Sequence, residues 1–152
     1  MKENTVLLMC PLYPPTQQRL EETYPVHRLW EAADEEALIA KLAPTLQVVV
    51  TSGGRGIDAA TLAKLPGVKL VSCFGVGVDA IDTAYCASHG IAVTNTPDVL
   101  TDDVADLAVA LMITSLRRIA EADRFVRAGQ WLKGSLPLGT AVAGRKVGII
   151  GM

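Results

Sequence analysis

The stretch LQVVVTSGGRG, from Leu46 to Gly56, decides the fold class. It begins with a run of apolar, mostly β-branched residues of strand length, in which apolar and polar positions do not alternate. A strand that is apolar on both faces belongs in a parallel sheet that is covered on both sides. The glycines that follow predict a tight turn at the carboxyl end of this strand.

Similar units lie on both sides of this stretch. Asp34, Asp58 and Asp82 stand where they would cap three helices, and Gly90 stands where it would end the third. Strands are predicted over Thr5–Cys10, Val26–Trp30, Leu46–Thr51, Lys69–Cys73 and Ile91–Thr94, with a further helix over Thr16–Tyr24. This alternation of strands and helices predicts an α/β fold with a doubly wound parallel sheet.

Composition excludes several classes of protein. Half of the 152 residues are hydrophobic and the formal net charge is −2, which is typical of a globular domain and argues against nucleic acid as a partner. No apolar run reaches the roughly 18 residues of a membrane span. Cys10, Cys73 and Cys86 match no zinc or C-x-x-C spacing, which favours a reducing compartment. We therefore expect a soluble, cytoplasmic protein without a metal site.

The second half of the chain predicts one long helix. Thr101 is a candidate N-cap, Asp102 and Asp103 complement the helix dipole, and apolar residues then recur at spacings of three and four until Gly129, about 28 residues on. Such a helix either crosses the sheet or leaves one domain to begin another. The natural hinge before it is NTPDV, residues 95–99.

The chain ends in GRKVGIIGM, residues 144–152. Lys146–Ile150 is predicted to be a buried strand. Gly151 would then be the first glycine of a Gly-x-Gly-x-x-Gly turn, the fingerprint of a dinucleotide site.

Two glycine-rich loops follow the third and fourth strands, where open α/β sheets bind their ligands. They are SGGRG (residues 52–56) and FGVGVDAID (residues 74–82). Gly75, Gly77 and Ala80 match G-x-G-x-x-A, yet the helix is predicted to start only after the motif. Three interpretations stay open: a dinucleotide site, a structural turn, or capture of a small carboxylate by consecutive backbone N–H groups, which is favoured.

Neither histidine is a catalytic candidate. His27 lies in a weak strand and His89 ends a helix, and neither has a Ser, Cys or carboxylate partner at a suggestive spacing. Both are assigned to the surface or to helix capping.

Four segments resemble the D-isomer-specific 2-hydroxyacid dehydrogenases: FGVGVDAID, GIAVTNTPDVLTDDVADLAVALMI, RFVRAGQW and GRKVGIIGM. The greatest similarity is to the glyoxylate/hydroxypyruvate reductase and hydroxyphenylpyruvate reductase branch, and it covers nearly the whole chain. The resemblance implies a flavodoxin-like substrate-binding domain over residues 1–97. Residues 98–152 would then form a hinge, a linking helix and the first strand of an incomplete NAD(P)-binding Rossmann domain.

The resemblance also assigns site residues. Gly53, Gly54, Val76 and Gly77 match substrate-binding positions, and Val76, Thr101 and Gly151 match positions near the cofactor. The family's catalytic Arg, Glu and His follow the fingerprint, and none has a counterpart in this sequence. The expected chain is thus a truncated enzyme, inactive alone and without catalytic residues of its own.

The implied activity of the parent enzyme is NAD- or NADP-dependent reduction of a small 2-keto acid to the D-2-hydroxy acid. Its expected partner is that acid, and its expected assembly is a homodimer. The alternative is a non-catalytic, flavodoxin-like module that binds small anions or dimerises.

Overall fold

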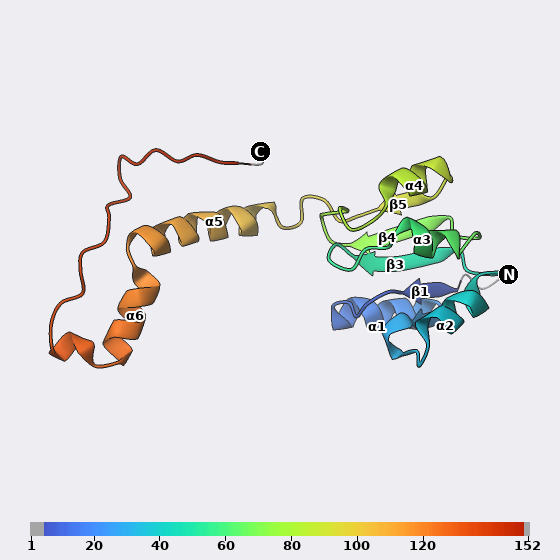
Figure 1. The fold of residues 1–152 in the computed structure, drawn as a ribbon, viewed down its shortest axis with the longest axis horizontal. Helices are drawn as coiled ribbons and strands as arrows, with labels where there is room; N and C mark the ends of the chain where they lie inside the picture. The colour runs from blue at the N-terminus through green and yellow to red at the C-terminus, as the bar shows by residue number, and fades with distance from the viewer. Residues whose placement is uncertain (1–4, 151–152) are drawn as a thin grey trace. The chain divides into compact units, whose positions relative to one another are not determined.

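The computed structural model describes residues 5–150, which fall into two compact units, the first ending at Val99 and the second beginning at Leu100 (Figure 1). The sheet of the first unit is made of β1 (Val6–Leu8), β2 (Val26–Arg28), β3 (Val48–Ser52), β4 (Leu70–Phe74) and β5 (Ala92–Thr94). Its strand order is β2-β1-β3-β4-β5 and every pairing is parallel. This is the flavodoxin-like order, so the predicted fold class of the first unit is confirmed.

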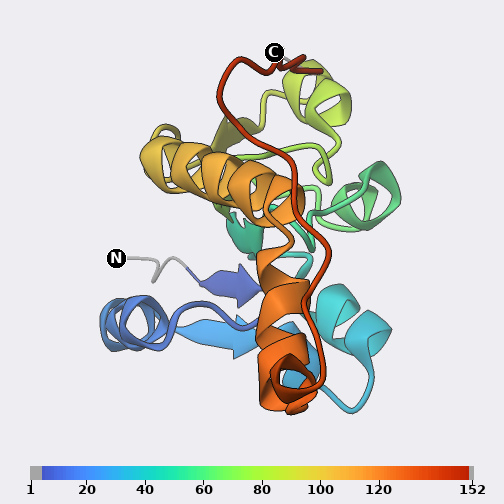
Figure 2. The ribbon, with the colours of Figure 1, turned by 90° about the vertical axis from the view of Figure 1, so that its left-hand side faces the viewer.

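Helices cover both faces of this sheet. They are α1 (Pro14–Thr23), the 3-10 turn η1 (Leu29–Glu31), α2 (Glu35–Leu42), α3 (Ala59–Ala63) and α4 (Thr83–Ser88). Figure 2 shows α1 on one side of the sheet and α2, α3 and α4 on the other. The parallel connections require this placement, because each helix carries the chain back to the edge where strands begin.

Alternating side chains divide the core into two clusters. Leu7 and Val49 point into the larger cluster beneath α2, α3 and α4, whereas Leu8 and Val50 point into the smaller cluster beneath α1. The residues buried most completely are Leu7, Leu8, Leu29, Leu46, Leu62, Leu65, Val49, Val71, Thr51, Cys73 and Cys86. Because β3 buries residues on both faces, it has the uniformly apolar sequence on which the fold class was predicted.

The three predicted aspartate caps are confirmed. The carboxylates of Asp34, Asp58 and Asp82 accept the N–H three residues on, at 3.0, 2.7 and 2.8 Å. Gly90, at φ +68°, follows α4 in the left-handed conformation that ends helices. Other element boundaries differ from the prediction. Helix α1 begins two residues before the predicted Thr16, because Pro14 and Pro15 suit the first turn of a helix. The strand predicted to reach Trp30 ends at Arg28 and passes into η1.

In the second unit the prediction of a single long helix is wrong. This unit contains α5 (Thr101–Leu116), α6 (Ile119–Arg127) and the 3-10 turn η2 (Gln130–Leu132). Arg118 between the helices has φ +55°, and the Thr140 N–H donates to the Leu116 carbonyl at 2.7 Å. A segment distant in sequence therefore caps the end of α5, which local sequence does not signal. Gly129, at φ +67°, does follow α6 as expected.

Two further expectations for this unit are wrong. Thr101 is the first residue of α5 and not its N-cap, which is Leu100 and makes no side-chain cap hydrogen bond. The strand predicted at Lys146–Ile150, which was to open a Rossmann domain, is irregular chain. A strand needs a neighbour for its hydrogen bonds, and the described part of this unit contains no other strand. Gly151 lies outside the described residues.

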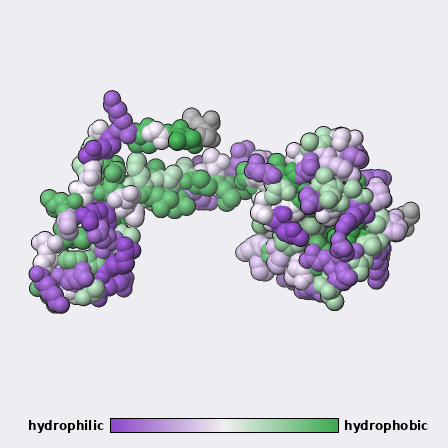
Figure 3. All heavy atoms as spheres, viewed as in Figure 1, coloured by the Kyte–Doolittle hydropathy of each residue, from purple (hydrophilic) through white to green (hydrophobic). Residues whose placement is uncertain are grey.

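Apolar side chains lie open along α5. The side chains of Val104, Leu107 and Leu111 are 60%, 57% and 59% exposed, and hydrophobic atoms line this helix in Figure 3. Exposed apolar surface of this extent marks contact sites. In the described residues no helix is both long and apolar enough to cross a membrane.

The fold predicts a sharp difference between two neighbouring glycines. Gly56 has φ +60°, and a β-carbon there would lie 1.8 Å from the Ala80 carbonyl oxygen, whereas one at Gly54 would meet nothing within 4 Å. Gly56→Ala should lower the free energy of unfolding by at least about 3 kcal/mol. Gly54→Ala, the matched control, should change it by less than about 0.5 kcal/mol. Urea denaturation followed by circular dichroism measures both, and equal midpoints would contradict the packing described.

The exposed face of α5 predicts self-association of the 152-residue chain. Leu107→Lys together with Leu111→Lys should lower the weight-average mass in sedimentation and reduce the fluorescence of a bound hydrophobic dye. Ala105→Lys is the control, since it adds charge on the same helix but removes little apolar surface. A wild-type chain that sediments as a monomer and binds no dye would show this prediction to be wrong.

Candidate carboxylate-binding site

The two glycine loops lie side by side at the carboxyl edge of the sheet. In the pairing of β3 with β4, Ser52 lies opposite Phe74, so both strands end at the same level. The loops that leave them, residues 53–56 and 75–81, therefore start as neighbours. This edge is where parallel sheets place their ligands.

The first loop is held closed by its own hydrogen bonds. The buried Thr51 hydroxyl donates to the Gly56 carbonyl at 2.8 Å, and the Gly56 N–H donates to the Ser52 carbonyl at 2.9 Å. The Ser52 hydroxyl accepts the Arg55 N–H at 3.2 Å and the Cys10 thiol at 3.3 Å. These bonds reach from the end of β1 into the loop and fix its conformation.

The two loops touch backbone to backbone. A β-carbon at Gly53 would lie 2.9 Å from the Gly77 carbonyl oxygen, so the close approach itself requires glycine. Further along, the Ile57 N–H donates to the Ala80 carbonyl at 3.0 Å and the Asp82 N–H to the Ile57 carbonyl at 3.1 Å. The sequence prediction treated the loops as neighbours, and the structure brings them into direct contact.

Four backbone N–H groups at this contact have no protein acceptor. Among residues 5–150, the N–H groups of Gly53, Gly54, Val76 and Gly77 donate to no described atom. Gly54, Val76 and Gly77 are exposed and Gly53 is half-buried, so the N–H groups of the first three are open to water or to a ligand. Successive N–H groups in a glycine-rich concavity attract an anion by their partial positive charge.

The structure does not support the dinucleotide interpretation of FGVGVDAID, because no helix starts within this motif. After Gly77 the chain continues as loop, and α4 starts only at Thr83 and is six residues long. Ala80, the third position of the motif, serves instead as the close neighbour of Gly56. The acid expected about 20 residues on, Asp98, lies in a turn at φ +63°. The loop therefore has no helix N-terminus to meet a pyrophosphate.

The described residues do not form a dinucleotide site of their own. Val76 is 42% exposed on the first unit, and Thr101 begins α5 of the second. Gly148 would meet nothing within 4 Å if it carried a β-carbon, in a segment without a strand. A glycine turn between strand and helix, the usual pyrophosphate cradle, is thus not formed by residues 100–150.

The histidines lie away from the glycine loops. His27 pairs with Leu7 within the sheet. His89 lies between α4 and β5, on the side of the sheet where the strands begin; its ring stacks on Tyr85 with centroids 3.9 Å apart, and its Nδ1 donates to the Tyr85 carbonyl at 2.9 Å. Both placements agree with structural roles.

The cysteines are free thiols in three different settings. Burial raises the pKa of the Cys73 and Cys86 thiols, and the nearby Cys10 raises that of Cys73 further. Cys73 therefore keeps its proton and donates it to the Gly77 carbonyl at 3.5 Å, which adds a contact beneath the second loop. The described residues contain no group of three or more His, Cys, Asp or Glu that could hold a metal ion.

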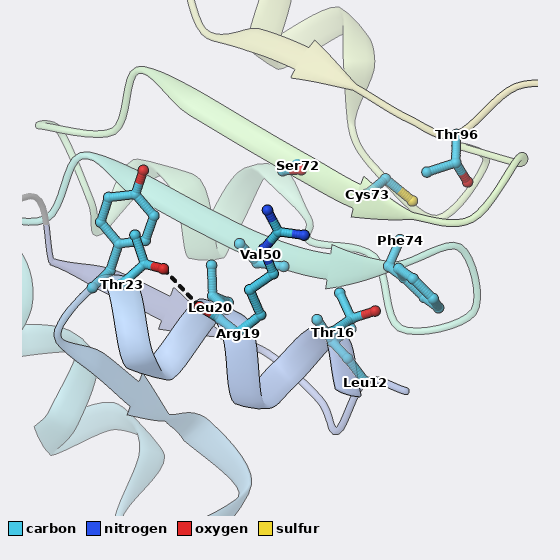
Figure 4. A pocket seen from close by; sticks show the side chains of 11 residues that line it. Leu12, Thr16, Arg19, Leu20, Thr23, Val50, Ser72, Cys73, Phe74 and Thr96 are labelled. Carbon is cyan, nitrogen blue, oxygen red and sulfur yellow. Dashed lines mark hydrogen bonds between the residues drawn. The ribbon is translucent and has the colours of Figure 1, made fainter. Parts of the chain in front are cut away.

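A groove of about 450 Å³ lies beside the loops, between α1 and the sheet (Figure 4). Its lining includes Leu12, Leu20, Val50, Ser72, Phe74 and Thr96, with Arg19 as the charged member. Within the first unit α1 is the helix on this side, and Ala92 and Thr94 of β5 are exposed. The groove belongs to this face of the sheet. We do not assign it to the candidate carboxylate site, because its lining contains none of the residues with unpaired N–H groups.

Comparisons with known proteins agree with this geometry. Residues 6–145 match the D-isomer specific 2-hydroxyacid dehydrogenase catalytic domain. The chain is 42% identical over 152 residues to glyoxylate/hydroxypyruvate reductase A of Arabidopsis thaliana, covering 100% of this chain and 49% of that protein. It is 43% identical over 147 residues to hydroxyphenylpyruvate reductase of Plectranthus scutellarioides, covering 97% and 47%.

A solved structure shows the same fold. The NADPH-dependent glyoxylate/hydroxypyruvate reductase of Sinorhizobium meliloti, in complex with NADP and malonate, superposes with a TM-score of 0.82 at 33% identity. The match covers 94% of this chain and 44% of that one. The chain thus spans about half the length of the relatives it matches. From the family match over residues 6–145, the shared fold and the paired glycine loops, it follows that the chain belongs to the D-isomer specific 2-hydroxyacid dehydrogenase family.

Proposed function

We propose that this chain supplies the carboxylate-binding half of a longer oxidoreductase. That enzyme would use NAD or NADP to reduce a small 2-keto acid of the glyoxylate or hydroxypyruvate type to the D-2-hydroxy acid. The observation that carries the proposal is the contact between the two glycine loops, which gathers the open N–H groups of Gly53, Gly54, Val76 and Gly77 at one edge of the sheet. The names of the relatives support the substrate class.

The proposed domain division follows from this role. Residues 1–97 would be the substrate-binding domain. Residues 98–152 would be the hinge, the linking segment and the start of an incomplete cofactor domain. In the longer enzyme, Val76, Thr101 and Gly151 would lie near the cofactor, and a homodimer would be the assembled form.

The chemistry of these loops is recognition through the backbone. Partial positive charges on fixed N–H groups stabilise a carboxylate without a titratable side chain, so binding by the loops needs no change of protonation. Arg55 is the charged residue of the first loop; its side chain is 48% exposed, and its Nη2 lies 3.8 Å from a Glu35 carboxylate oxygen, a surface ion pair of small energy. Anchoring the carboxylate fixes where the keto carbon of the substrate lies.

Reduction also requires a hydride donor and a proton donor. The described residues form no dinucleotide cradle, and the two histidines lie away from the glycine loops, His27 half-buried on the edge strand β2 and His89 at the end of α4. We therefore propose that this chain holds none of the catalytic residues, and that the chain alone binds the acid without turning it over.

The first test is turnover by the 152-residue chain. With NADH or NADPH and glyoxylate or hydroxypyruvate, nicotinamide absorbance should fall no faster than in the absence of protein. A complete 2-hydroxyacid dehydrogenase in the same assay is the positive control. Turnover that scales with the concentration of the purified chain would contradict the assignment of the catalytic residues elsewhere.

The second test asks whether the loops bind through their backbone. Oxamate, a small 2-keto acid analogue, should shift the amide resonances of Val76 and Gly77 in the labelled chain. Gly77→Val should weaken binding at least about tenfold, because a β-carbon there would lie 3.2 Å from an Asp79 carboxylate oxygen and the branched side chain would crowd the loop. Gly77 is not in the left-handed region, so steric crowding and not backbone strain is the expected cause.

The matched variant is Val76→Ala, which keeps the N–H and removes only side-chain methyl groups. It should change the dissociation constant by about twofold or less. Equal losses from both variants would argue against recognition through the backbone.

A further inference from the structure

Three successive carbonyl groups of the second loop are each held by a donor from the protein. The Gly75 carbonyl accepts the Thr96 N–H at 3.0 Å, and the Val76 carbonyl accepts the Asn95 side-chain amide at 2.7 Å. The Gly77 carbonyl accepts the Cys73 thiol at 3.5 Å. The loop is thus fixed through its acceptors, while its N–H groups stay open.

This pattern determines the direction of the open N–H groups. A trans peptide unit is planar, and its N–H points opposite to its C=O. The described chain contains no cis peptide bond. The bond from Asn95 to the Val76 carbonyl therefore turns the N–H of Gly77 away from Asn95, and the bond from Thr96 does the same for the N–H of Val76. Both N–H groups belong to the proposed carboxylate site.

Asn95 is well placed for this task. Ser72 pairs with Thr94 between β4 and β5, so the next residue stands at the carboxyl edge beside the loop. A carbonyl can only accept, so the Asn95 side chain must present its amide N–H₂ to it. Pro97 restricts Thr96 to extended conformations, which helps to hold the neighbouring donor in place.

We infer that Asn95 is a positioning residue for the carboxylate site, because its side-chain amide fixes the peptide between Val76 and Gly77 with the Gly77 N–H facing outward. The inference rests on the proposed function and adds to it a residue outside both glycine loops. Asn95 does not itself touch the acid; it acts through the peptide that does. Without its amide, this peptide can rotate, and the Gly77 N–H loses its fixed direction.

The experiment compares variants of the labelled 152-residue chain, first without ligand. In Asn95→Ala and Asn95→Asp, which lack the donor, the carbonyl ¹³C shift of Val76 and the N–H residual dipolar coupling of Gly77 should change. Asn95→Gln keeps an amide donor on a longer side chain and should restore both in part. Thr96→Ala keeps its backbone N–H and should leave both unchanged. Resonances of the sheet core report whether each variant is folded.

Titration with oxamate then measures the consequence. Asn95→Ala should raise the dissociation constant about five- to tenfold, the usual effect of one lost hydrogen bond. Asn95→Asp should raise it at least as much, since an ionised carboxylate also repels the anion. Asn95→Gln should recover most of the affinity, and Thr96→Ala should stay within about twofold of wild type.

The outcomes separate this inference from the proposed function. If oxamate shifts the Val76 and Gly77 amides and Asn95→Ala binds as tightly as wild type, the positioning role is overturned and the proposed function stands. If oxamate shifts neither amide in the wild-type chain, both fail. If affinity falls in Asn95→Ala while the Gly77 dipolar coupling stays unchanged, Asn95 contacts the anion directly and the positioning role is again overturned.

Discussion

Gly56 lies so close to the Ala80 carbonyl that a β-carbon would be 1.8 Å from its oxygen, and a β-carbon at Gly53 would lie 2.9 Å from the Gly77 carbonyl oxygen. These two contacts join the loops after β3 and β4 along their backbones. Hydrogen bonds between Ile57, Ala80 and Asp82 continue the junction beyond the strands. The position of every open N–H group at this edge depends on this contact, because the two loops supply them together.

The candidate site has few reactive side chains, as the proposed recognition through the backbone requires. In the described residues it contains no histidine and no metal-ligand cluster, and burial raises the pKa of its Cys73 thiol. What it offers is a fixed direction for several N–H dipoles. Neighbouring groups, such as the Thr51 hydroxyl and the Asn95 amide, bond to the carbonyls of the loops and leave the N–H groups open.

The two units differ in how far they bury their apolar side chains and pair their backbone groups. The first buries its apolar side chains on both faces of a sheet and caps three helices with aspartates. The second leaves Val104, Leu107 and Leu111 more than half exposed, and its Lys146–Ile150 segment has no strand to pair with among the described residues. An apolar helix and a single apolar segment cannot bury each other as a sheet and its helices do.

The sequence alone determined the parallel α/β class, three helix caps, the left-handed glycine after α4 and the two loops of the site. Each of these depends on residues close together in the chain: an apolar run, an aspartate three residues before the N–H it accepts, or a glycine where φ is positive. The family resemblance also pointed to Gly53, Gly54, Val76 and Gly77, whose binding role remains a prediction.

Only the tertiary structure decided the features that join distant residues. The break at Arg118 depends on Thr140 capping α5, and no glycine or proline marks it in the sequence. The strand predicted at Lys146–Ile150 did not form, because an apolar run specifies a strand only where a neighbour supplies hydrogen bonds. The hydrogen bond from the Asn95 side-chain amide to the Val76 carbonyl joins residues 19 apart in sequence. Such contacts join segments that are distant in the chain, so local sequence patterns do not predict them.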